Sequence, residues 1–204
     1  MTPTGIVVLR FGERRLPRTL TALPCCDGSD GTAVDEAAGV ARRVVVAGAD
    51  ADLATVLTRL MRGDLLDVEV AHVRCGPWSR FEARRALTGA ARRVPLIRDD
   101  TGTALVGAAV WLPPAGADQL RGEAVVDDTV LFDGTVAGVR VEPTAALPGL
   151  RAAVLGGPPR RWVSGRAAQL GTTGARVLRD GVAGRREVKR STFYRHTTGW
   201  LHVG

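Results

Sequence analysis

The sequence predicts an α/β first part followed by an antiparallel β second part. Between residues 43 and 73, one amphipathic helical period lies between two β-branched runs, which is the pattern of a strand, helix, strand unit. Beyond residue 90 no helical period occurs, and short strand candidates alternate with turn sequences. We therefore expect the α/β part to cover residues 1–90 and the antiparallel β part to cover residues 91–204.

Length and composition are compatible with this organisation. The chain has 204 residues, of which 45% are hydrophobic and 24% charged, enough for one domain or two small ones with a buried core. No apolar run reaches the roughly 18 residues that span a bilayer, and the N-terminus lacks an apolar stretch of signal-peptide length. Cys25, Cys26 and Cys75 offer neither a disulfide framework nor a spaced zinc pattern. These features predict a cytoplasmic protein with no membrane span and no bound metal.

The N-terminal segment is expected to contain two strands and a loop. Residues 5–11 and 15–23 are predicted to form two short strands around Gly12. Residues 24–35 are rich in Gly, Ser and Asp, which predicts a loop.

The next segment carries the clearest periodicity. Residues 43–47 predict a buried strand, and residues 67–73 alternate as a second strand, joined to the first by a right-handed crossover. The connecting helix is predicted from apolar residues at the spacing of one helix face: Leu53, Val56, Leu57, Leu60 and Met61. Asp50 or Asp52 can cap its start, and Gly63 can end it. A further helix is expected over residues 79–88.

Short strands make up the rest of the chain. The turn sequences between them include Asp133-Gly134 and Asp180-Gly181, which suit the positive φ of hairpin turns. The expected strands cover 94–98, 103–112, 122–126, 130–132, 136–141, 150–155, 162–170, 175–179, 187–194 and 200–203.

Positive charge is concentrated in the last quarter. Residues 151–204 carry eleven basic side chains against Asp180 and Glu187, whereas residues 1–150 carry seventeen basic and nineteen acidic ones. Only Lys189 among the 28 basic residues is a lysine, a bias typical of high-G+C genomes. The basic segment is therefore either a solvated face or a surface for phosphates, anionic lipid or nucleic acid.

The turn Ala47-Gly48-Ala49-Asp50-Ala51-Asp52 joins the first strand of the unit to its helix. A helix N-terminus favours phosphate, but two carboxylates occupy the same position, so the aspartates are either caps or groups for metal binding or proton transfer. Residues 43–60 resemble the Gly-Gly-Asp-Gly-Thr segment of the superfamily of diacylglycerol kinases, sphingosine kinases and NAD kinases. Residues 165–182, with Asp180-Gly181, are similar to the closing strands of the lipid-kinase β domain.

The resemblance implies a β-sandwich-like second part and a ligand cleft between the two parts. It implies ATP with magnesium, or NAD(P), as the ligand, and Asp50 and Asp180 as catalytic residues. The phosphate- and nucleotide-binding residues that it implies are Gly48, Ala49, Asp52, Arg179, Arg185 and Arg186. The sequence departs from the motifs, however, because the second and third glycines are Ala49 and Ala51, the threonine is Asp52 and the hairpin glutamate is Val182. These changes predict a degenerate active site.

Other catalytic motifs are absent from the sequence. The chain also resembles a high-G+C bacterial family whose members are sometimes labelled membrane metallopeptidases, but His72, His196 and His202 form no His-Glu-x-x-His motif. The serines lack a nucleophile-elbow context. Residues 185–196 mix bases with aromatic side chains, which fits either a nucleic-acid-binding strand or a strand with an ordinary core face.

Two functions remain as expectations. The first is a degenerate lipid or NAD kinase-like protein that binds a nucleotide or another phosphate-bearing ligand, with or without residual turnover. The alternative is a non-enzymatic interaction module, in which residues 151–204 bind an acidic partner such as anionic lipid, nucleic acid or protein. A second copy of the chain, paired through sheet edges, is a further expected partner.

Overall fold

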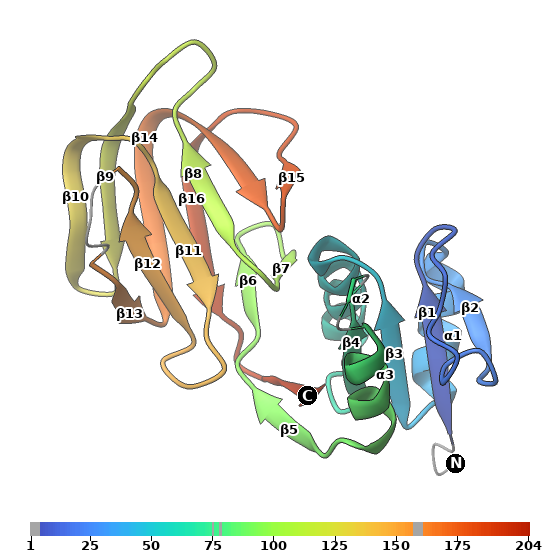
Figure 1. Cartoon of the computed structure of the whole chain (residues 1–204). Helices are drawn as coiled ribbons and strands as arrows, with labels where there is room; N and C mark the ends of the chain where they lie inside the picture. The colour runs from blue at the N-terminus through green and yellow to red at the C-terminus, as the bar shows by residue number, and fades with distance from the viewer. Residues whose placement is uncertain (1–4, 75, 78, 157–160) are drawn as a thin grey trace. The chain divides into compact units, whose positions relative to one another are not determined.

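Figure 1 presents the computed structural model, which describes residues 5–74, 76–77, 79–156 and 161–204. The chain divides into two compact units: Met1–Val94 with Thr198–Gly204, and Pro95–Thr197. The division predicted from the sequence, at residue 90, placed residues 198–204 in the β part. In the structure, their strand pairs with the sheet of the first unit instead. None of the described helices is long and apolar enough to cross a membrane.

A six-stranded sheet forms the centre of the first unit, with strand order β2-β1-β3-β4-β17-β5. Its strands are β1 (Ile6–Arg10), β2 (Cys25–Asp27), β3 (Arg43–Ala47), β4 (Glu69–Val73), β5 (Ala91–Val94) and β17 (Trp200–Val203). The helices are α1 (Gly31–Val40), α2 (Asp50–Arg62) and α3 (Ser79–Thr88). All strand pairs are parallel except that of β17 with β5. The predicted strand, helix, strand unit is confirmed as β3, α2 and β4.

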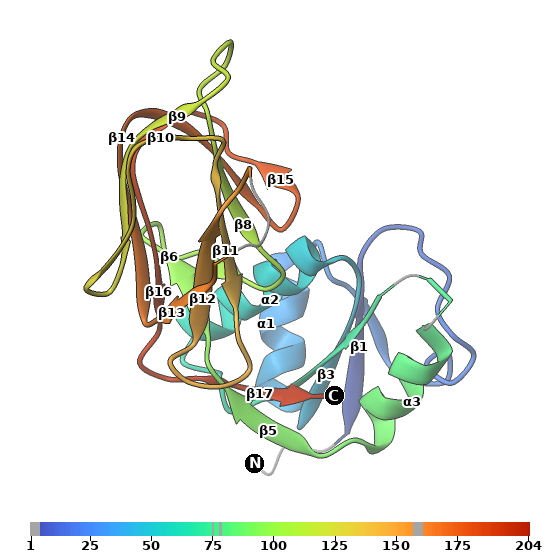
Figure 2. The ribbon, with the colours of Figure 1, turned by 60° about the vertical axis from the view of Figure 1, so that its left-hand side comes forward.

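Helices cover both faces of this sheet. Every residue of β3 is buried, as expected for a parallel strand with helices on either side. Ala83 and Ala86 of α3 pack on Val45 and Ala71, whose neighbours along the strands face the other way. Figure 2 shows α1 and α2 together on the face opposite α3.

A buried arginine joins β3 to the end of α3. Arg43 is only 3% exposed, and its guanidinium donates to the carbonyl oxygens of Ala86 (2.7 Å), Leu87 (3.1 Å) and Gly89 (2.9 Å). Its Nε donates to Glu69 on β4 at 2.6 Å. The guanidinium therefore satisfies carbonyls that the helix leaves without partners at its C-terminus.

Two expectations for the N-terminal segment are wrong. Residues 15–23 form turns rather than a strand, with Leu20 N–H donating to Pro17 and Leu23 N–H donating to Leu20. The first strand, β1, pairs on both edges with parallel strands, β2 and β3. Residues 24–35 are not one loop, since they contain β2 and the start of α1. Asp30 caps that helix by accepting Thr32 N–H at 2.9 Å.

The second unit is an antiparallel β structure, as the sequence predicts, and its described residues form eleven strands. They are β6 (Ile97–Asp99), β7 (Ala104–Leu105), β8 (Ala109–Leu112), β9 (Leu120–Val126), β10 (Thr129–Val136), β11 (Val139–Pro143), β12 (Leu150–Val154), β13 (Val163–Gly165), β14 (Ala167–Arg179), β15 (Val182–Ala183) and β16 (Val188–Arg195). The long strand β14 pairs with β9 and β16 over its first half and with β8 near its end. The sheet therefore folds around one core (Figure 1).

Trp111 and Phe193 are the largest fully buried side chains in this core, with ring centroids 5.9 Å apart. The buried indole N–H of Trp111 donates to Ser191 Oγ at 2.9 Å, so its polar atom is satisfied. The turn predicted at Asp133-Gly134 is wrong, because both residues lie inside β10 and pair with β9. The turn between β9 and β10 contains Asp127 instead, which has a φ of 49°. The predicted turn at Asp180-Gly181 is confirmed.

Candidate functional site

The candidate site lies at the carboxyl ends of the parallel strands of the first unit. The loop after β1 covers residues 11–24, the turn after β3 contains Gly48 and Ala49, and the segment after β4 leads to α3 at Ser79. In open parallel sheets, ligands bind outside this edge, where loops from neighbouring strands meet.

At the N-terminus of α2, the carboxylate of Asp52 occupies the position that an anion would take. Asp52 folds back so that its Oδ2 accepts Ala49 N–H at 2.7 Å. A Cβ atom on Gly48 would lie 2.6 Å from Asp52 Oδ2 and 2.7 Å from Asp52 Cβ. Position 48 thus has no room for a side chain, because of Asp52 itself. Arg14 Nη2 lies 3.5 Å from the same carboxylate oxygen.

Asp50, beside it, is also paired. Arg74 Nε donates to Asp50 Oδ1 at 3.0 Å, and His72 Nδ1 lies 3.8 Å from the same oxygen. His72 Nε2 is 3.0 Å from the carbonyl oxygen of Gly48. Burial lowers the pKa of His72 below its ordinary 6.5, so at neutral pH the ring is uncharged and its Nε2–H donates to Gly48. Neither carboxylate of the turn is without a partner.

The structure therefore brings together four predicted residues, Gly48, Ala49, Asp50 and Asp52. Their arrangement is closed in the sense that the polar groups of the turn are bonded within the chain. Their N–H and carboxylate groups bond to one another or to nearby cations. A phosphate at this helix terminus would have to displace Asp52, which already accepts the N–H that the phosphate would use.

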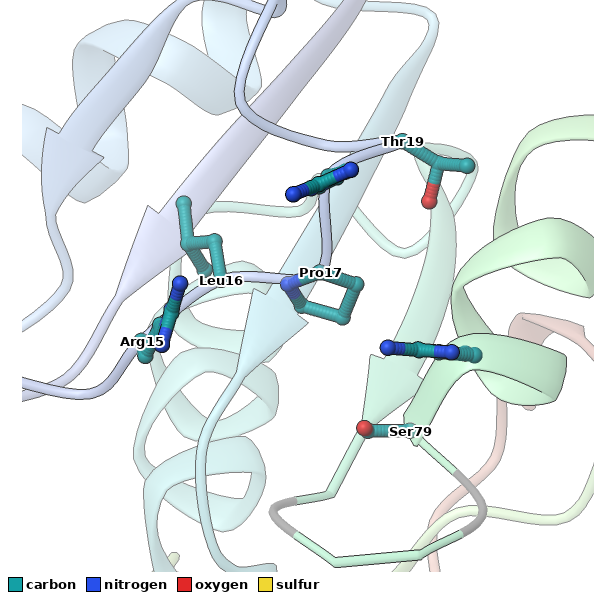
Figure 3. A pocket seen from close by; sticks show the side chains of 7 residues that line it. Arg15, Leu16, Pro17, Thr19 and Ser79 are labelled. Atoms are coloured by element: carbon teal, nitrogen blue, oxygen red, sulfur yellow. The ribbon is translucent and has the colours of Figure 1, made fainter.

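A pocket of about 620 Å³ opens next to loop 11–24, and the sequence analysis missed it. We call it the arginine pocket (Figure 3). Its lining residues come from the loop after β1 and from the start of α3: Arg15, Leu16, Pro17, Arg18, Thr19, Ser79 and Arg80. Within the described part of the chain, none of its three guanidinium groups has a hydrogen bond or ion pair, and none of its lining residues is acidic.

The arginine pocket combines two kinds of wall. Leu16 and Pro17 give an apolar surface, and Figure 3 shows Pro17 on the loop across from Ser79 on the helix. The guanidinium groups provide N–H forks that match phosphate oxygens in pairs. The volume is within the range of small-molecule sites, about 300–1,000 Å³. The cluster Arg14-Arg15-Leu16-Pro17-Arg18 was the available sequence signal, and the strand prediction for residues 15–23 obscured it.

The predicted residues of the second unit have mainly internal contacts. Asp180 accepts the backbone N–H groups of Val106 (3.1 Å), Gly107 (2.6 Å) and Ala108 (3.1 Å), which connect β7 to β8. Arg179 Nε lies 2.6 Å from the fully buried carboxylate of Asp99.

Arg185 and Arg186 are exposed, and neither side chain has a hydrogen bond or ion pair to another described residue. Catalysis by Asp180 stays a prediction, as does ligand binding by Arg179, Arg185 and Arg186.

A second pocket, of about 520 Å³, lies in the second unit and has mixed charge. Asp127 in its wall accepts Arg166 N–H and Ala167 N–H, both at 2.9 Å, and Arg195 donates to Pro148 at 3.0 Å. Because its lining contains two aspartates as well as two arginines, this pocket favours an anion less than the arginine pocket does.

Comparison with known proteins identifies the fold. No protein-family model matches the sequence, and no curated protein matches it. Among solved structures, an NAD kinase from Archaeoglobus fulgidus in complex with ATP matches with a TM-score of 0.66 at 12% identity, over 98% of this chain and 94% of that one. Two structures described as diacylglycerol kinases from Bacillus anthracis match with TM-scores of 0.76 and 0.68, at 10% and 12% identity. Each covers 97% of this chain and 96% of the other.

The chain has the fold of the NAD kinases and diacylglycerol kinases. The predicted fold class is thereby confirmed, and the resemblance to these kinases is confirmed at the level of the fold. In the turn at Gly48, for which the sequence predicts a resemblance to the glycine-rich motif, Asp52 accepts the Ala49 N–H.

Proposed function

We propose that the chain binds a phosphate-bearing small molecule in the arginine pocket and transfers no phosphoryl group. The observation that carries this proposal is the convergence of Arg15, Arg18 and Arg80 on one pocket. None of the three has a partner among the residues that the structure describes. Unpaired guanidiniums that share a cavity with no acidic wall favour an anion with several oxygen atoms.

The altered turn supports the second half of the proposal. Phosphoryl transfer depends on donors and cations held around the transferring group. At α2, Asp52 takes the Ala49 N–H, and the pairs Arg14–Asp52 and Arg74–Asp50 use the nearby cations. A phosphate at that place would meet two carboxylates, which oppose it near a helix start.

Nucleotides are the first ligands to test. The Archaeoglobus fulgidus NAD kinase with this fold was solved with ATP. By extension, ATP, ADP, NAD and NADP are our candidates for this chain, with inorganic pyrophosphate as the minimal probe. The apolar wall at Leu16 and Pro17 would then contact a part of the ligand beyond its phosphates.

The test is calorimetric titration of the full chain with these compounds. Arg18→Ala and Arg80→Ala should each weaken binding about ten-fold or more, because a hydrogen bond between charged groups contributes about 1.5–3 kcal/mol. Arg84→Ala is the matched control, since it removes the same charge from α3 at an exposed position outside the pocket lining. Equal losses in all three variants would mean that net charge, not the pocket, binds the ligand.

A second candidate function rests on the basic segment 185–190, which leads from β15 into β16. Arg185, Arg186, Lys189 and Arg190 are exposed there, and their side chains have no partners elsewhere in the described chain. Glu187, the acidic residue among them, accepts Ala115 N–H at 2.7 Å. This basic segment would bind an acidic partner such as anionic lipid or nucleic acid. Such binding weakens steeply as salt increases, whereas binding in a pocket changes less.

A further inference from the structure

The acidic residues near the arginine pocket do not form a magnesium site. The resemblance to kinases implies magnesium held by acidic groups, so we compared the side chains of this edge with what that ion needs. Magnesium requires carboxylate oxygens arranged in octahedral geometry with water. Within the described ranges, no cluster of three or more His, Cys, Asp or Glu side chains could hold a metal ion.

The carboxylates of the α2 turn and of α3 already have cationic or N–H partners. Asp50 pairs with Arg74, and Asp52 with Arg14 and Ala49 N–H. Glu82 on α3 accepts Arg74 N–H at 2.7 Å. To bind here, a metal ion would have to break a charge-assisted contact at every ligand position.

The arginine pocket can provide the positive charge that the metal would have provided. Arg15, Arg18 and Arg80 carry three positive charges, and each guanidinium presents a fork of N–H donors. Magnesium bridges neighbouring phosphate oxygens and neutralises their charge. A magnesium complex of the ligand would therefore present to the forks fewer free oxygens and less negative charge.

From this we infer that the pocket takes its ligand as the free polyphosphate anion, a diphosphate or triphosphate group without magnesium. The inference rests on the proposed function and adds to it the ionic form of the ligand. Magnesium should then compete with the protein for the ligand instead of helping it to bind.

The experiment measures the binding of pyrophosphate and ADP to the full chain by calorimetry, once in EDTA and once in saturating magnesium. Sodium chloride equalises the ionic strength of the two buffers, because screening alone would weaken binding. We expect affinity at least ten-fold higher in EDTA. Arg18→Ala and Arg80→Ala, which lie on different elements, should each reduce the affinity in EDTA. Each should also reduce the difference in affinity between the EDTA and magnesium buffers. Arg84→Ala should have the wild-type affinity in both buffers.

The outcomes separate the inference from the proposal beneath it. Binding that is tighter in magnesium, or equal in the two buffers, overturns the inference but leaves phosphate binding in place. Absence of binding in both buffers overturns the proposed function and the inference with it. Thermal unfolding of each variant shows whether the loss of binding reflects loss of the fold.

Discussion

Asp180 gives the sharpest test of whether a motif residue serves chemistry or structure. Its carboxylate accepts three backbone N–H groups from the connection between β7 and β8, at 2.6–3.1 Å. Its own backbone has φ of 49°, a conformation that glycine and asparagine also adopt. Asp180→Gly therefore removes the carboxylate and keeps the turn, and Asp180→Asn keeps part of the acceptor.

The expected loss follows from these contacts. A hydrogen bond to a charged group contributes about 1.5–3 kcal/mol, but this carboxylate is only partly buried, so water replaces some of what is lost. We expect Asp180→Gly to lower the free energy of unfolding by about 3 kcal/mol, or roughly 6–12 °C in Tm for a chain of this size. Asn keeps one carbonyl oxygen for the two bonds that Oδ1 accepts, so Asp180→Asn should cost about half as much.

Urea unfolding followed by tryptophan fluorescence and circular dichroism measures both variants. Coincident transitions would confirm that a single free energy describes the unfolding. Pyrophosphate binding should be unchanged in both variants, because the arginine pocket belongs to the first unit. Variants of wild-type stability that lose ligand binding would refute this reasoning and assign Asp180 to a ligand site.

Three further predictions concern the first unit. Gly48→Ala should destabilise the chain even without ligand, because the new methyl group meets Asp52, and urea unfolding of the unliganded protein checks this. Arg43→Met should lower the free energy of unfolding by about 3–5 kcal/mol through loss of a buried pair, whereas Arg42→Met, at an exposed site, should cost under about 1 kcal/mol. Stability should fall from pH 7.5 to 5.5, because burial lowers the pKa of His72 and the unfolded chain therefore binds the proton first. Thermal melts of His72→Gln should show a weaker pH dependence.

Local patterns predicted the centre of the first unit correctly. Residues 43–47, the helix after them and α3 were identified from side-chain period and glycine stops, which depend only on neighbouring residues. The strand β17 was assigned to the wrong part because its partner β4 lies about 130 positions earlier in the chain. A short strand carries no signal of which sheet it will join.

The candidate site was predicted less well, for a related reason. The turn at Gly48 was located, but its closed state depends on Arg14 and Arg74, which belong to other loops. The contacts of Asp180 are with residues more than seventy positions away. Two of the pocket arginines, Arg15 and Arg18, lie in a segment whose turns were predicted as a strand.

In this structure, Gly48 is required for a different reason from the one that the motif suggests. A glycine after a buried strand usually indicates close approach of a phosphate to the backbone. At Gly48 the close approach is made by Asp52, so the position stays restricted to glycine whether or not a ligand binds. The carboxylate and its partner Arg14 stabilise the helix start in the way that a bound phosphate and its counter-charge would. Gly48 by itself is therefore no evidence for phosphate at this turn, and under the proposed function Arg15, Arg18 and Arg80 are the more informative residues for the ligand.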